Sequence, residues 1–242
     1  MAYRRGGPLI VNSKCFALAS HMTFYAVWPI AWLVDFILYR ISAKGRWKIK
    51  ELRKKEKNAI LVSNHTTPLD PILMCTTVYP LSIWHTLLEA TMCTPMLGTL
   101  IQLLGGMPIP SGRNGKERFI ENIKVALKKR PFIHIYPEGE CYIQNQEVYK
   151  FHQGAFLASM ELNIPIIPIA TVFTEPKKIL GWKSVRPRAT VYVLDPIYPE
   201  NFTSAREFAE FTRQTIQAEI NRRGGTNAYC KGHMERIEGI ND

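Results

Sequence analysis

The chain has 242 residues, 46% of them hydrophobic, and a formal net charge of +11. That length can bury one substantial core, and a single domain is favoured over two. The five cysteines are odd in number and widely spaced, without a Cys-x-x-Cys or Cys/His cluster, so neither a disulfide framework nor a metal site is indicated. A reducing compartment is therefore expected.

The first feature along the chain is an apolar and aromatic segment, residues 15–39. As a helix it would be roughly 37 Å long at about 1.5 Å per residue, which is enough to cross a bilayer. Pro29 in its middle and Asp35 near its end argue against a straight span, because proline breaks the hydrogen-bond ladder and a lipid-exposed carboxylate is costly.

Basic residues flank this segment on both sides, and residues 1–57 hold twelve Lys/Arg against three acidic residues. Each such cation is worth about 1 kcal/mol against an anionic leaflet. We therefore predict an N-terminal membrane-associating segment, residues 1–57, whose two half-helices break near Pro29 and dip into one leaflet from the cytoplasmic face. A single span is the main alternative, and a cleaved signal peptide is less favoured because the apolar part is too long.

Residues 58–242 alternate between short apolar runs and helix-forming stretches, which is an α/β pattern. Strands are predicted at residues 59–62, 132–136, 164–172 and 189–194. Helices are expected to begin near Asp70, Gly115 and Gly154. A last helix should follow the capping box of Ser204 and Glu207 and end before Gly224.

His65 and Asp70 stand at the end of the first of these strands, separated by four residues. A base oriented by a carboxylate is the minimum equipment for deprotonating a hydroxyl, and a strand end, a short loop and a helix start would bring the two side chains together. Asp70 before Pro71 is also typical of a helix N-cap. One carboxylate can serve both purposes, so the two interpretations overlap.

The run Asn64-His65-Thr66-Thr67-Pro68-Leu69-Asp70 resembles the Asn-His-x4-Asp block of the glycerolipid acyltransferases, best known from the lysophosphatidic acid acyltransferases. Further blocks follow in the family's order. They are Leu-Gly-Gly-Met-Pro-Ile at 104–109, Tyr-Pro-Glu-Gly at 136–139, Phe-His-Gln-Gly-Ala at 151–155 and Ile-Pro-Ile-Ile-Pro-Ile at 164–169. The ordered set is far more specific than any one block, and the resemblance covers about residues 58–195. It implies a mixed sheet flanked by helices.

The resemblance also implies roles for individual residues. His65 would take the proton of an acceptor hydroxyl, Asp70 would fix the imidazole tautomer, and the acceptor oxygen would attack an acyl thioester directly. Backbone N–H groups near Gly105-Gly106 and near the turn 137–139 are expected to stabilise the oxyanion. Glu138 and Gly139 carry over as acceptor-binding residues. Asn64 either tunes the His65 loop or stabilises an Asx turn.

Two departures from the family pattern concern the acceptor's phosphate. Pro110-Ser111 stands where the second block usually ends in Asp-Arg, and Glu140-Cys141 stands where the third block continues with Thr-Arg. Those arginines would hold a phosphate with a bidentate fork. The cations that can replace them, or that are simply solvated, are Arg113, Lys116, Arg118, Lys150 and His152.

These observations predict a membrane-associated enzyme that moves a fatty acyl group from acyl-CoA or acyl carrier protein to a lysophospholipid, best matched by 1-acylglycerol-3-phosphate. No cofactor, metal or nucleic acid partner is expected. Three alternatives stay open. They are another lysolipid or aminolipid acceptor, a thioesterase with Cys141 as nucleophile and His65 as its base, and a non-catalytic lipid-binding protein.

Overall fold

The computed structural model describes residues 10–11, 13–94, 96–110, 114–175 and 187–230. Within them one seven-stranded sheet has the order β1-β7-β6-β2-β5-β3-β4. The strands are β1 (Ser42–Lys44), β2 (Ala59–Ser63), β3 (Trp84–Leu88), β4 (Gly106–Ile109), β5 (Phe132–Ile135), β6 (Ile166–Thr174) and β7 (Arg188–Val193). All neighbours pair in parallel except β6 and β7. The predicted mixed sheet is confirmed.

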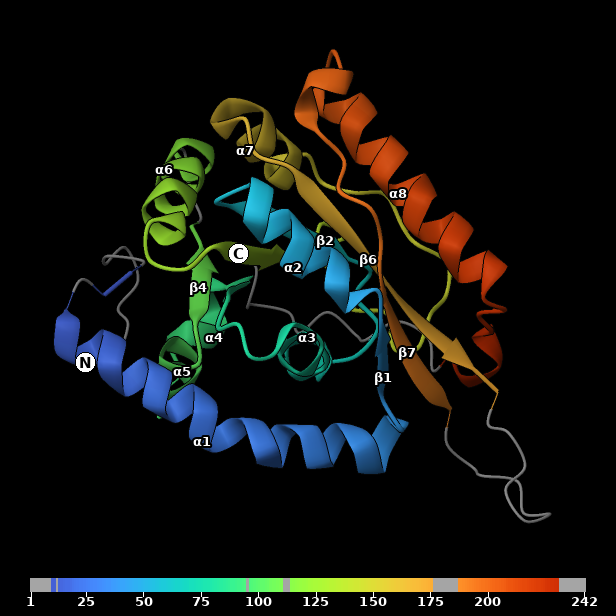
Figure 1. The fold of residues 1–242 in the computed structure, drawn as a ribbon, viewed down its shortest axis with the longest axis horizontal. Helices are drawn as coiled ribbons and strands as arrows, with labels where there is room; N and C mark the ends of the chain where they lie inside the picture. The colour runs from blue at the N-terminus through green and yellow to red at the C-terminus, as the bar shows by residue number, and fades with distance from the viewer. Residues whose placement is uncertain (1–9, 12, 95, 111–113, 176–186, 231–242) are drawn as a thin grey trace.

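Helices cover both faces of the sheet (Figure 1). The α-helices are α1 (Lys14–Tyr39), α2 (Arg46–Lys55), α3 (Asp70–Val78), α4 (Glu89–Met92), α5 (Leu97–Leu103), α6 (Gly115–Leu127), α7 (Gly154–Leu162) and α8 (Ala205–Arg222), and short 3₁₀ turns lie at Pro199–Asn201 and Asn227–Tyr229. Strand β2 is buried on both sides, with Ile60 and Val62 facing α6, α7 and α8 and with Ala59 and Leu61 facing α2 and α3. The predicted α/β fold with flanking helices is therefore confirmed.

The predicted elements agree with the structure where their sequence signals are strong. Helices α3, α6 and α7 begin at the three expected residues, and the Ser204 hydroxyl accepts from the Glu207 N–H at the start of α8. Residues 42–55, which the sequence places in the N-terminal segment, form β1 and α2, and β1 pairs with β7. The sheet therefore begins before residue 58.

The expected break at Pro29 is absent, since α1 is one helix from Lys14 to Tyr39 with Pro29 inside it. The prediction of two half-helices is therefore wrong for the described residues. Contacts on both sides of the proline hold the helix in place. Trp28 stacks on Tyr79 with ring centroids 3.8 Å apart, and the Thr76 hydroxyl donates to the Asp35 carboxylate at 2.7 Å. These contacts with residues distant in the sequence compensate for the backbone hydrogen bond that the proline removes from the helix.

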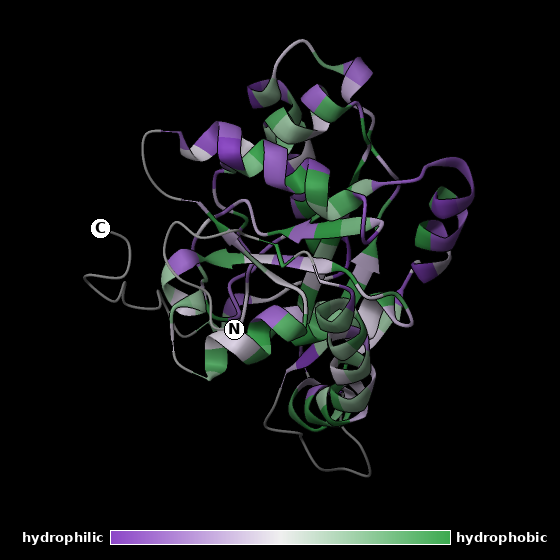
Figure 2. Ribbon diagram, turned by 90° about the vertical axis from the view of Figure 1, so that its left-hand side faces the viewer, coloured by the Kyte–Doolittle hydropathy of each residue, from purple (hydrophilic) through white to green (hydrophobic). Residues whose placement is uncertain are grey.

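Helix α1 lies along the outside of α3 and α5 rather than projecting from the domain (Figure 1). Its polar contacts run from Ser20, which donates to the Leu103 carbonyl, to Tyr39, which pairs with Thr67 at 3.2 Å. Its outer face exposes apolar side chains such as Leu33, Phe36 and Ile37. Figure 2 shows the helix end-on at the bottom, with much of it in the hydrophobic colour range. Among the described helices it alone is long and apolar enough to cross a membrane. Only 11% of its most apolar 18-residue stretch is buried.

The Asp35 carboxyl on α1 is completely buried against α3, and its Oδ1 has no hydrogen-bond partner among the described residues. Burial raises its pKa to about 7 from the ordinary value of 3.8, the Thr76 hydroxyl opposes the rise, and the Asp70 charge adds to it. Because ionisation is harder in the folded protein than in the unfolded chain, the stability that the protonated form provides is lost as the pH rises from about 4 to about 7.

We expect Asp35→Asn to raise the unfolding temperature at pH 8 more than at pH 5, because the variant has no carboxyl to ionise. Thermal unfolding of both proteins in the same detergent across this pH range measures the effect. A gain that is equal at both pH values, or larger at pH 5, would contradict a buried titrating carboxyl. Asp195→Asn, which changes a largely exposed carboxylate, is the control and should leave the pH profile unchanged.

Candidate active site

The candidate site lies where β2 and β5 end at the same edge of the sheet. Val62 of β2 pairs with Ile135 of β5, so the loop that starts at Asn64 lies beside the turn of residues 136–139. Ligand sites of open α/β sheets lie at the carboxyl ends of parallel strands. The register therefore unites two blocks that are about seventy residues apart in the sequence.

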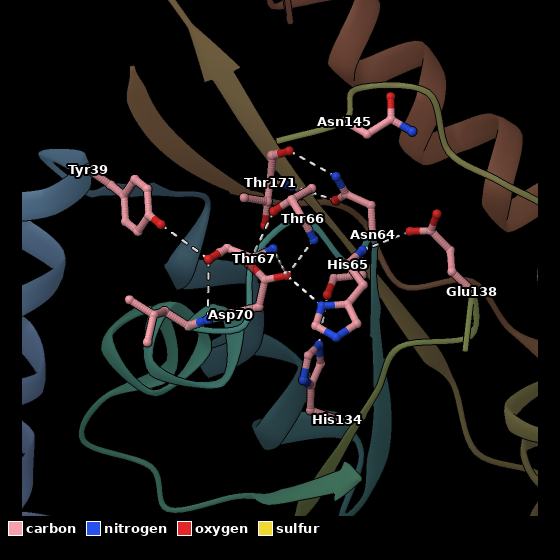
Figure 3. Close-up of polar contacts among 12 residues, drawn as sticks. Tyr39, Asn64, His65, Thr66, Thr67, Asp70, His134, Glu138, Asn145 and Thr171 are labelled. Carbon is pink, nitrogen blue, oxygen red and sulfur yellow. Dashed lines mark hydrogen bonds and ion pairs between the residues drawn. The ribbon is translucent and has the colours of Figure 1, made fainter. Parts of the chain in front are cut away.

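His65 and Asp70 are in direct contact, with Nδ1 of the imidazole 2.8 Å from Oδ2 of the carboxylate (Figure 3). Because a carboxylate only accepts, Nδ1 carries the hydrogen and Nε2 keeps its lone pair. Nε2 has no hydrogen-bond partner among the described residues, and the His65 side chain is 20% exposed. The ring therefore leaves Nε2 available to a group that enters the site, as the predicted role of a general base requires.

The Asp70 carboxylate organises the loop as well as the imidazole. Its oxygens accept from the backbone N–H groups of Thr66 and Thr67 and from the Thr66 hydroxyl. These donors precede α3, whose N-cap position is Leu69 and has no side-chain hydrogen bond. The N-cap interpretation of Asp70 is therefore wrong in detail, because the carboxylate caps the preceding loop rather than its own helix.

Tyr136 holds the His65 ring from one side, and sequence reasoning gave this residue no role. The two rings are stacked with centroids 4.1 Å apart and planes 19° apart. Behind Tyr136 lies the buried His134, whose Nε2 bonds the Ser63 hydroxyl at 2.9 Å and whose pKa burial lowers well below its ordinary value. His134 therefore stays neutral and structural. The sequence feature that could have predicted this role of Tyr136 is an aromatic residue directly after a central strand, level with the His65 loop.

Asn64 is buried and bonds the backbone of Thr171 in β6 in both directions. Its amide donates to the Thr171 carbonyl at 3.0 Å and its side-chain oxygen accepts from the Thr171 N–H at 2.8 Å. The buried side chain is therefore paired with a neighbouring strand, and its predicted contact with a substrate stays a prediction. Of the two predicted roles, setting the position of the His65 loop fits this pairing, because Asn64 adjoins His65 directly.

Glu138 is also turned inward and supports the loop. Its carboxylate accepts from the backbone N–H of His65 at 2.8 Å and from that of Tyr149 at 3.1 Å. Burial raises its pKa to about 7, the two backbone donors oppose this rise, and the nearby Asp70 charge adds to it. We infer a positioning role for Glu138, because both of its carboxylate oxygens accept from backbone N–H groups, and its predicted contact with an acceptor stays a prediction.

We expect Glu138→Gln to lower the turnover rate about ten- to a hundredfold, because glutamine has one acceptor oxygen for two backbone donors and a buried unpaired N–H costs about 1–3 kcal/mol. In the wild type, protonation of Glu138 below about pH 7 should weaken the same bonds and lower the rate as the pH falls. Steady-state rates from pH 6 to 8 measure both effects. The exposed Glu147→Gln is the matched control, and wild-type turnover in Glu138→Gln would contradict the role.

The sheet register separates Gly105 and Gly106 from the site. Gly106 pairs with His85 and so lies level with Leu61, four residues before His65, and β4 stands three strands away from β2. The Gly105 N–H is already bonded to the Gln102 carbonyl. The other end of β4 is the end that faces the site edge, so the register lends no support to a substrate or oxyanion contact of these glycines, which stays a prediction.

Three predicted site residues remain, namely Gly139, Lys150 and Arg113. Gly139 has φ +74°, where glycine is favoured, and a Cβ there would approach the His152 ring to 3.0 Å. Its N–H is bonded to the Tyr136 carbonyl, so it closes the turn beside His65. Lys150 is exposed and follows Tyr149, which binds Glu138. Arg113 lies outside the described residues.

Cys141 is half-buried near the acidic side chains, and this environment disfavours a thiolate. Burial raises the pKa of its thiol to about 12, and the Asp70 and Glu138 charges add to the rise. The segment after it supports the His65 loop, since the Tyr142 N–H donates to the His65 carbonyl and the Gln144 N–H to the Thr66 carbonyl.

Among the described residues, no three His, Cys, Asp or Glu side chains gather as a metal-ligand set.

The chain is similar to several known proteins. A model of the acyltransferase family matches residues 44–172. An uncharacterized acyltransferase of Schizosaccharomyces pombe is 28% identical over 66% of this chain, which spans 59% of that protein. A Caenorhabditis elegans protein named as a candidate 1-acyl-sn-glycerol-3-phosphate acyltransferase is 26% identical over 76% of this chain and 73% of its own length. The crystal structure of the 1-acyl-sn-glycerophosphate acyltransferase PlsC from Thermotoga maritima has a TM-score of 0.62 at 16% identity, covering 86% of this chain and 79% of that one, and so shares the fold.

Proposed function

The chain belongs to the acyltransferase family, and from that premise we propose that it transfers a fatty acyl group from acyl-CoA or acyl carrier protein to the free hydroxyl of a lysophospholipid, namely 1-acylglycerol-3-phosphate. The observation that carries the proposal is the His65–Asp70 pair at the end of a central strand, in which the His65 side chain is partly exposed and Nε2 has no partner among the described residues. The name of the Caenorhabditis elegans relative supports the choice of acceptor.

The chemistry follows from the imidazole. His65 Nε2 takes the proton of the acceptor hydroxyl while the oxygen attacks the carbonyl carbon of the thioester. The C–S bond then breaks, and the imidazolium returns the proton to the leaving thiolate. Asp70 keeps the hydrogen on Nδ1 and stabilises the imidazolium, as in the carboxylate–imidazole pairs of hydrolases. Stacking on Tyr136 fixes the plane of the ring.

Helix α1 supports an enzyme at the membrane surface, and the choice of the cytoplasmic face rests on the basic residues that flank the helix in the sequence. Its inner side contacts the domain from Ser20 to Tyr39, so a transmembrane span would carry the domain into the bilayer, whereas a helix lying in the interface would not. The exposed apolar outer face then lies in the lipid. Because Tyr39 bonds Thr67 of the His65 loop, a lysolipid in the same leaflet has its hydroxyl close to the base.

A product assay tests the proposal. Membranes that hold the protein are incubated with a radiolabelled acyl thioester and a panel of lysolipids and aminolipids, with acyl-CoA and acyl carrier protein compared as donors. An acyltransferase gives labelled diacyl lipid, and 1-acylglycerol-3-phosphate should be the best acceptor. Labelled free fatty acid without an acceptor would favour a thioesterase, and no product at all would favour a lipid-binding protein. The raised pKa of the Cys141 thiol speaks against the thioesterase.

The acceptor preference can be shifted at Cys141, where the family pattern has arginine. We expect Cys141→Arg to improve the use of 1-acylglycerol-3-phosphate relative to acceptors without a phosphomonoester, because a charge-assisted contact is worth about 1.5–3 kcal/mol. Relative kcat/KM values on paired acceptors measure the change. Cys141→Ser is the control and should alter little. An equal loss on all acceptors would show that the thiol is a packing position and would leave Lys150 and Arg113 as the next candidates for the phosphate contact.

A further inference from the structure

A cationic pocket lies between α2 and the end of α3, with a volume of about 370 Å³. Its walls are Arg46, Ile49, Lys50 and Arg53 of α2 and the stretch from Thr77 to Leu81. Asp70 begins α3 and Val78 ends it, so the pocket lies at the opposite end of that helix from the candidate active site, roughly 12 Å along its axis. It is therefore distinct from the site that holds His65.

The charge of this pocket is uncompensated. Arg46, Lys50 and Arg53 recur at helical spacing, and no acidic side chain of the described residues lines the pocket. Arg46 donates to the Tyr79 carbonyl, which is an ordinary use of a cation at a helix C-terminus. Lys50 and Arg53, however, form no hydrogen bond or ion pair among the described residues. Two cations that line one pocket and have no partner among the described residues favour a phosphate-sized anion.

The pocket adjoins the apolar helix α1. Tyr25 donates its hydroxyl to the Pro80 carbonyl at 3.0 Å, and Trp28 stacks on Tyr79, and both Pro80 and Tyr79 line the pocket. Trp47 on α2 is 58% exposed beside Arg46. Tyrosine and tryptophan side chains of this kind concentrate at the level of lipid headgroups. An anion bound here would thus lie at the headgroup level of the membrane that α1 contacts.

We propose that the α2–α3 pocket binds the phosphate headgroup of an anionic membrane phospholipid, separately from the lipid that reacts at His65. The bound headgroup neutralises Lys50 and Arg53 and fixes the orientation of α1 on the membrane surface. The inference rests on the proposed membrane contact of α1 and is independent of the chemistry at His65. The volume of about 370 Å³ suits a phosphoglycerol-sized group.

Two charge-matched double variants on one helix test the proposal. Lys50→Gln with Arg53→Gln removes the pocket cations, and Lys54→Gln with Lys55→Gln removes two exposed cations of α2 that do not line it. Glutamine is as good a helix former as lysine, so both should fold, and their unfolding temperatures check this. Flotation with phosphatidylcholine vesicles, with and without phosphatidylglycerol, gives the affinities.

We expect the pocket variant to lose at least about tenfold more affinity for the phosphatidylglycerol vesicles than the control variant, and both to bind neutral vesicles like the wild type. Equal losses of affinity in the two variants would overturn the proposal and would indicate binding by diffuse surface charge. Failure of the wild type to prefer anionic vesicles would overturn it as well.

A second experiment, with soluble ligands in place of vesicles, identifies the source of the phosphate. Short-chain phosphatidylglycerol below its micelle concentration should raise the unfolding temperature of the wild type and the control but not of the pocket variant. An equal effect of inorganic phosphate or free coenzyme A would overturn the lipid assignment in favour of a soluble anion. Turnover of a short-chain soluble acceptor should be the same in all three proteins, so the outcome is independent of the proposed reaction at His65.

Discussion

Replacing His65 with alanine is expected to lower the rate of acyl transfer by about 10² to 10⁴, because a general base in the transition state contributes about that factor. In the described part of the chain, no other histidine occupies an equivalent position. His134 and His85 are both buried, and burial lowers their pKa values. Among the histidines that the structure describes, His65 alone is bonded to the Asp70 carboxylate. The rate of labelled diacyl lipid formation measures the effect.

The His65→Ala variant must remain folded for the result to count. The ring is partly exposed and stacks on Tyr136 without filling the core, so the unfolding temperature and vesicle binding should change little. His21→Ala, which removes an exposed imidazole on α1, is the matched control and should retain activity. Near-normal turnover in His65→Ala would exclude the base mechanism.

Replacing Asp70 with asparagine should be as severe for activity and should also lower stability. One carboxylate oxygen accepts from the His65 ring and from two backbone N–H groups, and an amide cannot satisfy the same donors without turning its own N–H₂ towards one of them. Because the group is almost fully buried, the cost is on the order of 1–3 kcal/mol per unpaired donor.

We therefore expect Asp70→Asn to lower turnover by about 10² or more, since the imidazole loses both its tautomer control and the charge that stabilises the imidazolium. Kinetics and thermal unfolding on the same preparation separate the two effects. Asp195→Asn is the control, because that carboxylate is 81% exposed in a surface ion pair and should affect neither. Full activity in Asp70→Asn would contradict a role in orienting His65.

Sequence patterns located the buried strands and the helix starts correctly because their signals are local. Apolar β-branched runs predict β2, β5, β6 and β7, and these strands form the centre and one side of the sheet. The missed strands lack this signal. β1 has three residues, β3 contains His85, and β4 contains Gly106 and the proline Pro108, residues that are poor strand formers and are tolerated near a sheet edge.

The parts of the site that depend on distant partners could not be predicted. Asn64 bonds Thr171, more than one hundred residues away, and Glu138 bonds the backbone of His65. Both residues belong to recognisable blocks, yet only the folded chain distinguishes a buried support from a substrate contact. The continuity of α1 through Pro29 has the same origin, since it depends on contacts with Tyr79 and Thr76 rather than on local propensity.

The order in which label appears tests the central claim most directly, because direct attack requires that donor and acceptor be present together. Purified protein is first incubated with acyl-labelled thioester alone, and 1-acylglycerol-3-phosphate is added afterwards. The account predicts no protein-bound label and no free fatty acid in the first step, followed by labelled diacyl lipid once the acceptor arrives. Label trapped on Cys141, or fatty acid released before the acceptor is added, would contradict direct attack by the hydroxyl that His65 deprotonates.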